Sequence, residues 1–295
     1  MKIRLYLLAV MSVMTGLQSL NAQFTKVEQE IIFQSKIDNA ITLDVLDKGD
    51  KFVFIANNRS FYPYSLNIKF DELRNLTPEI RIKKFIVMSG RNTLFTLTLK
   101  DETKSHTFKY NYSYRIGIPG KKADTNYPYL IPIGIGRNVP VFKAKEKENV
   151  YLKDYFRMQK GDTVFCMRKG YIAAVPDMFH VTDRISTQKS VEIIHNDETV
   201  MIYGNIDPEN ILVKPGTTIY PGQPLGLIND ETGLDVVLYQ IEEEGKLQRL
   251  DIKYVTGVDK VQPFSPDFAN LKVIHPNDIV TREISKREKK NYRKN

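Results

Sequence analysis

The sequence is poor in the side chains that build covalent and metal cross-links, with one cysteine and four histidines in 295 residues. The single cysteine, Cys166, cannot form a disulfide within the chain, so stability must come from a packed core. Cys166 also lies far from the N-terminus, so we expect no N-terminal lipid anchor. No histidine is near it in the sequence, so we expect a buried small apolar residue rather than a thiol nucleophile.

The chain also lacks an uninterrupted apolar run long enough for a comfortable membrane span. Its N-terminus places Lys2 and Arg4 before a short apolar run that ends in small and polar residues around Ala22. This layout is typical of a secretory signal peptide, so we predict a signal peptide over residues 1–22, with cleavage near Ala22. We therefore expect an exported protein of the cell envelope, located in the periplasm.

The positive charge of the chain is unevenly distributed. The formal net charge is +8, but the segment Arg282 to Asn295 alone holds seven basic and two acidic residues. A nearly neutral body argues against nucleic acid as a partner. We expect a mobile, basic C-terminal tail over residues 269–295, either simply solvated or binding an anionic envelope polymer or lipid surface.

Long helical periodicity is nearly absent as well. Short runs rich in β-branched and aromatic residues recur between turn signals, as in "DKFVFIANNRSFYPYSLNIKF" and "DTVFCMRKGYIAAV". The predicted fold class is all-β. Glycines and prolines cluster between Gly117 and Gly136, which indicates a boundary between an N-terminal β-sandwich over residues 23–120 and a second domain over residues 121–268.

The second domain carries closely spaced turn glycines, and Ser190 to Asp207 reads as a tight hairpin. Such compact, crossed β structure also occurs in lipoyl or biotinyl carrier domains. A carrier domain needs an exposed lysine at a hairpin tip, and no such lysine is found here. The stretches from Tyr129 to Asp251 instead resemble the lysostaphin-type, LytM-like zinc peptidases of bacterial cell walls. The resemblance is carried by "VEIIHNDETVMIYGNID", "VKPGTTIYPGQPLG" and "VVLYQIEEEGK", in the order and spacing of that family. It implies a LytM-like β-sheet core of the duplicated hybrid motif type.

The same resemblance locates the positions where the family holds zinc. The family uses a histidine, an aspartate and the second histidine of an H-x-H pair, with a water at the open position. Here the aspartate position falls on Tyr155, the pair falls on Val236 and Leu238, and a further family histidine falls on Asn205. We therefore expect no metal, no cofactor and no catalytic residues.

His195 matches a family histidine that is not a zinc ligand, and one imidazole cannot hold a divalent ion alone. We interpret it as a survivor of a site that has lost its metal. The resemblance then implies a degenerate groove, and the residues expected to line it are Tyr155, His195, Tyr203, Asn205, Val236, Leu238 and Tyr239.

Three functions remain open at this point. The preferred one is an inactive LytM-like homologue that binds peptidoglycan or an envelope protein and could regulate a cell-wall hydrolase. The second is an active zinc endopeptidase of peptidoglycan with non-standard ligands, such as Asp154, His180 and His195. The third is a structural component of an envelope assembly, which would use the sandwich for contacts and the basic tail as a tether.

Overall fold

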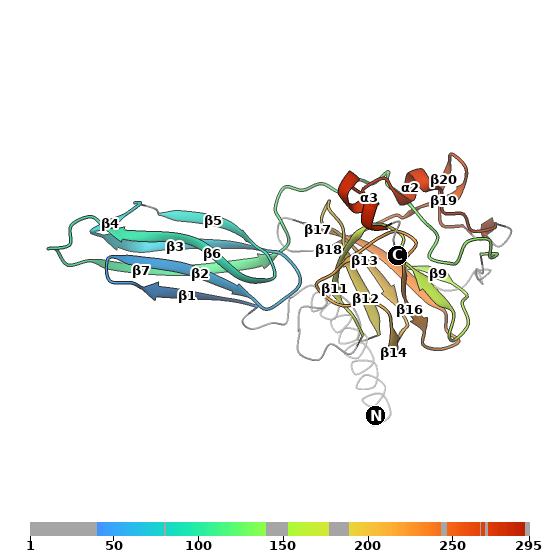
Figure 1. Cartoon of the computed structure of the whole chain (residues 1–295), viewed down its shortest axis with the longest axis horizontal. Coiled ribbons are helices and arrows are strands. Elements are labelled where there is room, and N and C mark those ends of the chain that lie inside the picture. The colour runs from blue at the N-terminus through green and yellow to red at the C-terminus, as the bar shows by residue number, and fades with distance from the viewer. Residues whose placement is uncertain are drawn as a thin grey trace, which may run out of the picture.

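The computed structural model describes residues 40–79, 81–139, 153–176, 189–242, 247–265, 267–268 and 271–292. Within these ranges the chain is built from strands, with two short helices near the C-terminus, so the all-β prediction is confirmed (Figure 1). None of the described helices has the length and apolarity to cross a membrane. The predicted signal peptide and His180 lie outside the described residues.

The N-terminal part is a sandwich of two antiparallel sheets. In the first sheet the order is β1 (Ile41–Asp47), β2 (Lys51–Asn58), β6 (Gly90–Leu99) and β4 (Leu76–Thr77). In the second it is β5 (Ile82–Val87), β3 (Tyr64–Arg74) and β7 (Thr107–Ile116). Alternate side chains such as Phe54, Leu66 and Leu97 are fully buried between the sheets, which is the period-two pattern of half-buried strands. These strands lie within the predicted sandwich, whose boundaries at residues 23 and 120 stay a prediction.

The second part, the body, holds three sheets. The largest runs β15 (Thr218–Ile219), β11 (Gly170–Ala174), β12 (Ser190–Ile194), β13 (Thr199–Gly204), β17 (Leu234–Ile241) and β18 (Leu247–Leu250), with β9 (Asp154–Phe156) also paired to β17. A second sheet has the order β10 (Thr163–Phe165), β16 (Pro224–Ile228) and β14 (Ile206–Ile211). The third has the order β20 (Lys260–Pro263), β19 (Lys253–Gly257) and β8 (Pro128–Tyr129). The predicted hairpin is confirmed, since β12 and β13 pair antiparallel around a turn at residues 195–198.

The large sheet has two faces of different character. Its inner face carries Val191, Tyr203, Val236 and Leu238, which join one core cluster with Val164, Leu225 and Ile228 of the second sheet. Its outer face carries Glu192, Ile194, Val200, Ile202 and Ile241. Successive residues of a strand point to opposite faces, so register alone assigns each side chain to one of them.

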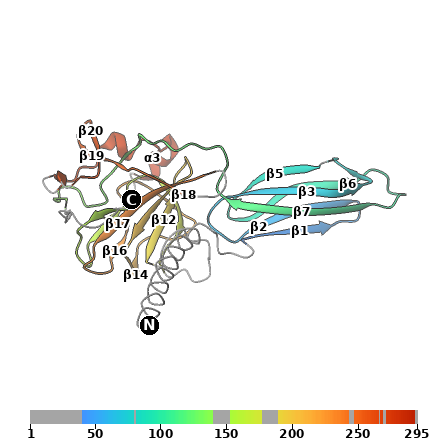
Figure 2. The same ribbon diagram turned by 180° about the vertical axis from the view of Figure 1, so that it is seen from behind.

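The outer face is partly covered by the sandwich. Ile194, Val200, Ile202 and Ile241 belong to the same apolar cluster as sandwich residues. The Tyr62 hydroxyl, also fully buried, donates a hydrogen bond to the Glu192 carboxylate across this junction. Figures 1 and 2 show the result, an elongated molecule in which the sandwich projects from one side of the body.

The C-terminal segment corrects one expectation. Residues 271–289 do not extend away as a mobile tail but pack on the body, with Val273, Val280 and Ile284 buried. Backbone hydrogen bonds join Val273 to Gly136 and Arg137, and the segment then forms α2 (Asn277–Val280) and α3 (Lys286–Tyr292). The expectation failed because it counted charges, whereas the apolar side chains between those charges fix the segment to the core.

Candidate functional site

The end of the large sheet where β9 meets β17 holds the positions matched to the family's metal ligands. Tyr155 lies directly opposite Asp235, and opposite residues of an antiparallel pair share one face. Both therefore lie on the outer face, where they are half-buried. The ammonium of the exposed Lys153 lies 2.6 Å from Asp235 Oδ2 and neutralises this carboxylate.

Val236 and Leu238 do not lie beside Tyr155. They are 1% and 2% exposed and face the inner core, so the prediction that they line a groove is wrong. Between them, Val237 pairs with Ile202 and lies on the outer face. The outer face at this end thus carries Tyr155, Asp235 and Val237. The two β17 residues of this set each precede by one position the predicted residues Val236 and Leu238.

Asn205 lies at the end of β13, with a backbone φ of 60° in the left-handed region that asparagine tolerates. Its Nδ2 donates to Gly233 O at 2.8 Å, and to Thr232 Oγ1 and Asp230 Oδ1 at 3.0 Å each. Hydrogen bonds from Thr232 are the main cause that holds the pKa of Asp230 well below its usual range. Asn205 therefore ties the turn at residues 230–233 to β13, and its amide donors are used for structure.

Tyr203 is fully buried, and its hydroxyl accepts a hydrogen bond from Met167 N–H at 2.9 Å. Cys166 lies beside it, and burial raises the pKa of the Cys166 thiol to about 12. Cys166 is buried as expected, and a thiol in this state is not a nucleophile near neutral pH. Of the residues predicted to line a groove, Tyr203 is therefore another core residue, while Tyr239 is half-buried on the outer face.

His195 lies in the turn between β12 and β13 and is 2% exposed, so it does not line a groove either. Its Nδ1 lies 2.9 Å from Lys169 O, which fits the neutral tautomer that carries its proton on Nδ1. Burial, reinforced by the charge of Arg168, lowers the pKa of His195 to about 3. The imidazole is therefore neutral across the physiological range.

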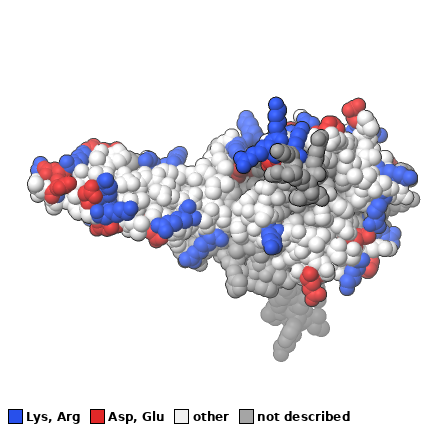
Figure 3. All heavy atoms as spheres, viewed as in Figure 1, with Lys and Arg blue, Asp and Glu red and all other residues white. Residues whose placement is uncertain are grey.

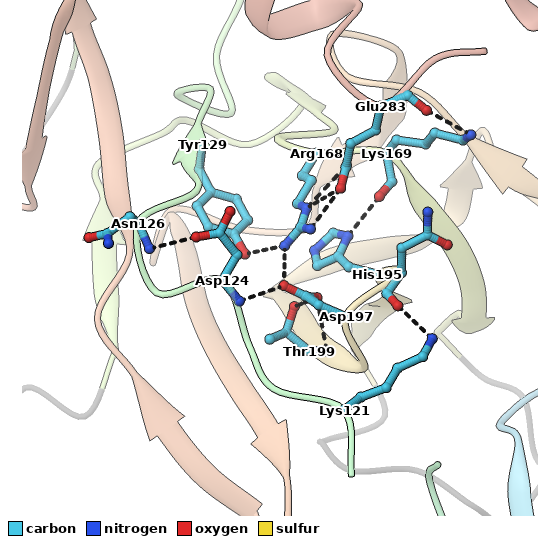
Figure 4. Close-up of polar contacts among 11 residues, drawn as sticks. Lys121, Asp124, Asn126, Tyr129, Arg168, Lys169, His195, Asp197, Thr199 and Glu283 are labelled. Atoms are coloured by element: carbon cyan, nitrogen blue, oxygen red, sulfur yellow. Dashed lines mark hydrogen bonds and ion pairs between the residues drawn. The ribbon is translucent and has the colours of Figure 1, made fainter. Parts of the chain in front are cut away.

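Arg168 organises the surroundings of His195, and Figure 4 shows its contacts. Its guanidinium is buried and pairs with Glu283 at 2.7 and 3.1 Å and with Asp197 at 2.9 Å. It also donates to the Tyr129 hydroxyl at 3.1 Å and stacks 3.8 Å from the centre of the Tyr127 ring. One arginine thus joins the segment before β8, the β12–β13 turn and the C-terminal segment.

Asp197 is the second centre of this cluster. Burial raises its pKa, but the charge of Arg168 and hydrogen bonds from Asp124 N–H and Thr199 outweigh burial and lower the pKa to about 2. Nearby, Lys121 donates to Asn196 O at 2.6 Å. The cluster was missed at the sequence level, because "CMRKGY" reads as an ordinary charged turn and nothing local identifies its distant carboxylates.

No group of three or more metal-binding side chains occurs within the described ranges. Asp154 lies on the inner-face side of β9, where its Oδ2 accepts a hydrogen bond from Tyr254 OH at 2.8 Å. It points away from Tyr155, because adjacent side chains of a strand lie on opposite faces. His195 adjoins Thr199 at the opposite end of β13, about 13 Å along the strand from the end where β9 pairs. Asp154 and His195 are therefore not brought together as ligands.

A hollow of about 500 Å³ lies where the inter-domain segment passes the end of β17. It is lined by Pro119, Gly120, Lys121, Lys122, Gln240, Ile241 and Glu242. Lys121 already binds the β12–β13 turn, at Asn196 O and at the Glu198 carboxylate. The hollow thus belongs to the packing of the inter-domain segment and contains none of the residues matched to metal ligands.

No family model matches the chain, and no curated protein matches it. Among solved structures, the chain is similar to the catalytic domain of the peptidase lysostaphin from Staphylococcus simulans, with 15% identity over 40% of this chain and 88% of that one, at a TM-score of 0.28. It is also similar to Helicobacter pylori Csd3, with 10% identity over 89% and 82% of the two chains and a TM-score of 0.29. A zinc-containing peptidase from Vibrio cholerae shows 12% identity over 78% and 91%, at 0.30. At these TM-scores the likeness has no bearing on activity.

Proposed function

We propose that residues 121–268 form a degenerate LytM-like domain of an exported protein, and that it binds peptidoglycan or an envelope protein without cleaving it. The order and spacing of the three motif stretches between Tyr129 and Asp251 support the family assignment. The large sheet of the body, with the hairpin of β12 and β13 at its centre, is compatible with it. Regulation of a cell-wall hydrolase is one use of such a protein.

The observation that carries the proposal is the chemistry of the outer face at the β9 end of the sheet. Catalytic zinc takes three protein ligands and leaves one position for water. At this end the outer face carries the Asp235 carboxylate, which Lys153 neutralises, together with the phenol of Tyr155 and the aliphatic Val237. Glu192, on the same face, is buried beneath the sandwich and accepts the hydrogen bond from Tyr62. Asn205, beside them, uses its amide for the turn at residues 230–233. This donor set does not fit a catalytic zinc.

The same face suits binding. Tyr155 is half-buried and presents an amphipathic ring, while the pair formed by Lys153 and Asp235 supplies polar contacts beside it. Tyrosine is among the residues that most often dominate binding energy at interfaces, and a polar rim fixes orientation. An extended peptide, such as the peptide part of peptidoglycan or a segment of an envelope protein, matches this combination.

The test is sedimentation of the chain from Gln23 onward with purified peptidoglycan sacculi, comparing Tyr155→Ala with the parent. We expect Tyr155→Ala to weaken binding at least tenfold, in line with loss of an aromatic anchor. Tyr112→Ala, which removes a 39% exposed tyrosine from the sandwich, is the matched control and should bind like the parent. Equal binding by Tyr155→Ala and the parent would refute the role of Tyr155 in binding. If the parent does not bind sacculi, the same comparison is made with envelope proteins.

A further inference from the structure

In the C-terminal segment the acidic side chains point toward the body and the basic side chains point toward the solvent. Within residues 282–289 both carboxylates, Glu283 and Glu288, are turned toward the body. The four cationic side chains of the same stretch are exposed, and they are Arg282, Lys286, Arg287 and Lys289. A stretch that is mixed in sequence therefore presents mainly positive charge to the solvent, since Glu283 and Glu288 are only partly exposed.

The inward direction of the two carboxylates is fixed by their partners. Glu283 pairs with the buried Arg168, and Lys169 Nζ donates to the Glu283 carbonyl oxygen at 3.0 Å. Glu288 lies 2.9 Å from Lys169 Nζ and accepts hydrogen bonds from Tyr220 OH at 3.2 Å and Ser285 N–H at 2.9 Å. Hydrogen bonds from Lys169 and Ser285 lower the pKa of Glu288 to about 2. Both carboxylates are thus paired with cations of the body and are turned away from the outward cations.

The outward surface is cationic and carries no large exposed apolar side chain. Ile284, the aliphatic residue of the stretch, is 5% exposed and faces the core. Figure 3 shows basic side chains gathered at the top of the body, where Figure 1 places α3. The hollow described above includes none of these four side chains. The surface is thus suited to a broad anionic surface rather than to a small enclosed ligand.

We propose that the four outward cations of residues 282–289 form a docking surface for an anionic phospholipid bilayer. Contact is electrostatic and peripheral, because no apolar side chain of this stretch is available to enter the acyl region. Each basic residue near an anionic leaflet strengthens binding by about fivefold, so four fixed on one surface suffice for reversible association. Because the segment is already packed on the body, binding does not have to order a free tail, which would cost conformational entropy. This inference is independent of the proposed function of the β9 end of the sheet.

The test is co-sedimentation of the chain from Gln23 onward with vesicles, so that the apolar residues 1–22 cannot insert. Vesicles of phosphatidylcholine containing about one third phosphatidylglycerol are compared with pure phosphatidylcholine at low and physiological salt. The test variant carries Arg282→Gln, Lys286→Gln, Arg287→Gln and Lys289→Gln. The control variant carries Lys48→Gln, Lys84→Gln, Arg91→Gln and Lys214→Gln, which removes the same net charge from exposed positions elsewhere. Circular dichroism and thermal melting confirm that both variants fold.

We expect the parent and the control variant to bind anionic vesicles and not neutral ones. Their affinity for anionic vesicles should fall as salt is added. The test variant should bind anionic vesicles at least tenfold more weakly than the control variant. Equal loss in both variants would overturn the proposal in favour of a general charge effect. Failure of the parent to bind anionic vesicles would also overturn it. Stronger binding to soluble polyphosphate or DNA than to vesicles would overturn the proposal and identify an anionic polymer as the ligand of this surface.

Discussion

Arg168→Met is expected to lower the free energy of unfolding by about 3–5 kcal/mol, the range for removing one partner of a buried ion pair. The Arg168 side chain is 3% exposed, so no water can replace its contacts. Its removal leaves Glu283 and Asp197, which are 18% and 13% exposed, without the cation that both of them face. Methionine keeps much of the side-chain volume, so the loss reports the missing charge rather than a cavity.

The measurement is urea denaturation, with hydrogen exchange of residues 271–292 as a second readout. We expect faster exchange there, because Glu283 anchors the segment through Arg168. Arg137→Met is the matched control, since Arg137 pairs with Asp162 at 3.0 Å but is 58% exposed. Surface pairs of this kind contribute less than about 1 kcal/mol. Equal destabilisation by the two variants would contradict the role given to Arg168.

Tyr62→Phe is expected to lower the free energy of unfolding by about 1.5–3 kcal/mol, the range for hydrogen bonds to carboxylate groups. The substitution removes only the hydroxyl that donates to the fully buried Glu192. This bond joins the sandwich to the outer face of the large sheet, so its loss weakens the junction. We also expect the segment between β7 and β8 to become more sensitive to limited proteolysis.

Tyr112→Phe is the control for this prediction. It removes the same hydroxyl from a 39% exposed tyrosine on β7, where water can replace any contact. Surface changes of this kind shift stability by no more than about 0.5 kcal/mol. If Tyr62→Phe is as stable and as resistant to protease as Tyr112→Phe, the bond between Tyr62 and Glu192 does not hold the junction.

Local sequence patterns predicted the secondary structure well. Runs of β-branched and aromatic residues between turn signals predicted the strands, because a half-buried pleated surface favours those side chains. The hairpin from Ser190 to Asp207 was predicted because its turn residues interrupt two apolar runs. These features depend on neighbours a few residues apart, which the sequence displays directly.

The site was predicted less well, because its residues are placed by long-range pairing. Motif spacing assigned Val236 and Leu238 to the ligand positions, but the register against Tyr155 turns Asp235 and Val237 to that face. An error of one residue reverses the face of a strand side chain. Likewise, the pairing of Arg168 with Glu283 spans more than one hundred residues, and no local pattern indicates it.

The outer face beside Tyr155 and Asp235, as we propose, does not hold a catalytic zinc. The most direct test is the zinc content per chain of the protein from Gln23 onward, by elemental analysis after equilibration with zinc and extensive dialysis. The zinc-containing peptidase from Vibrio cholerae, treated in parallel, controls for loss of bound zinc during dialysis. We predict substoichiometric zinc, with no difference between the parent and Asp235→Asn. One tightly held zinc per chain, lost in Asp235→Asn or in a His195 variant, would contradict the account and favour an active peptidase.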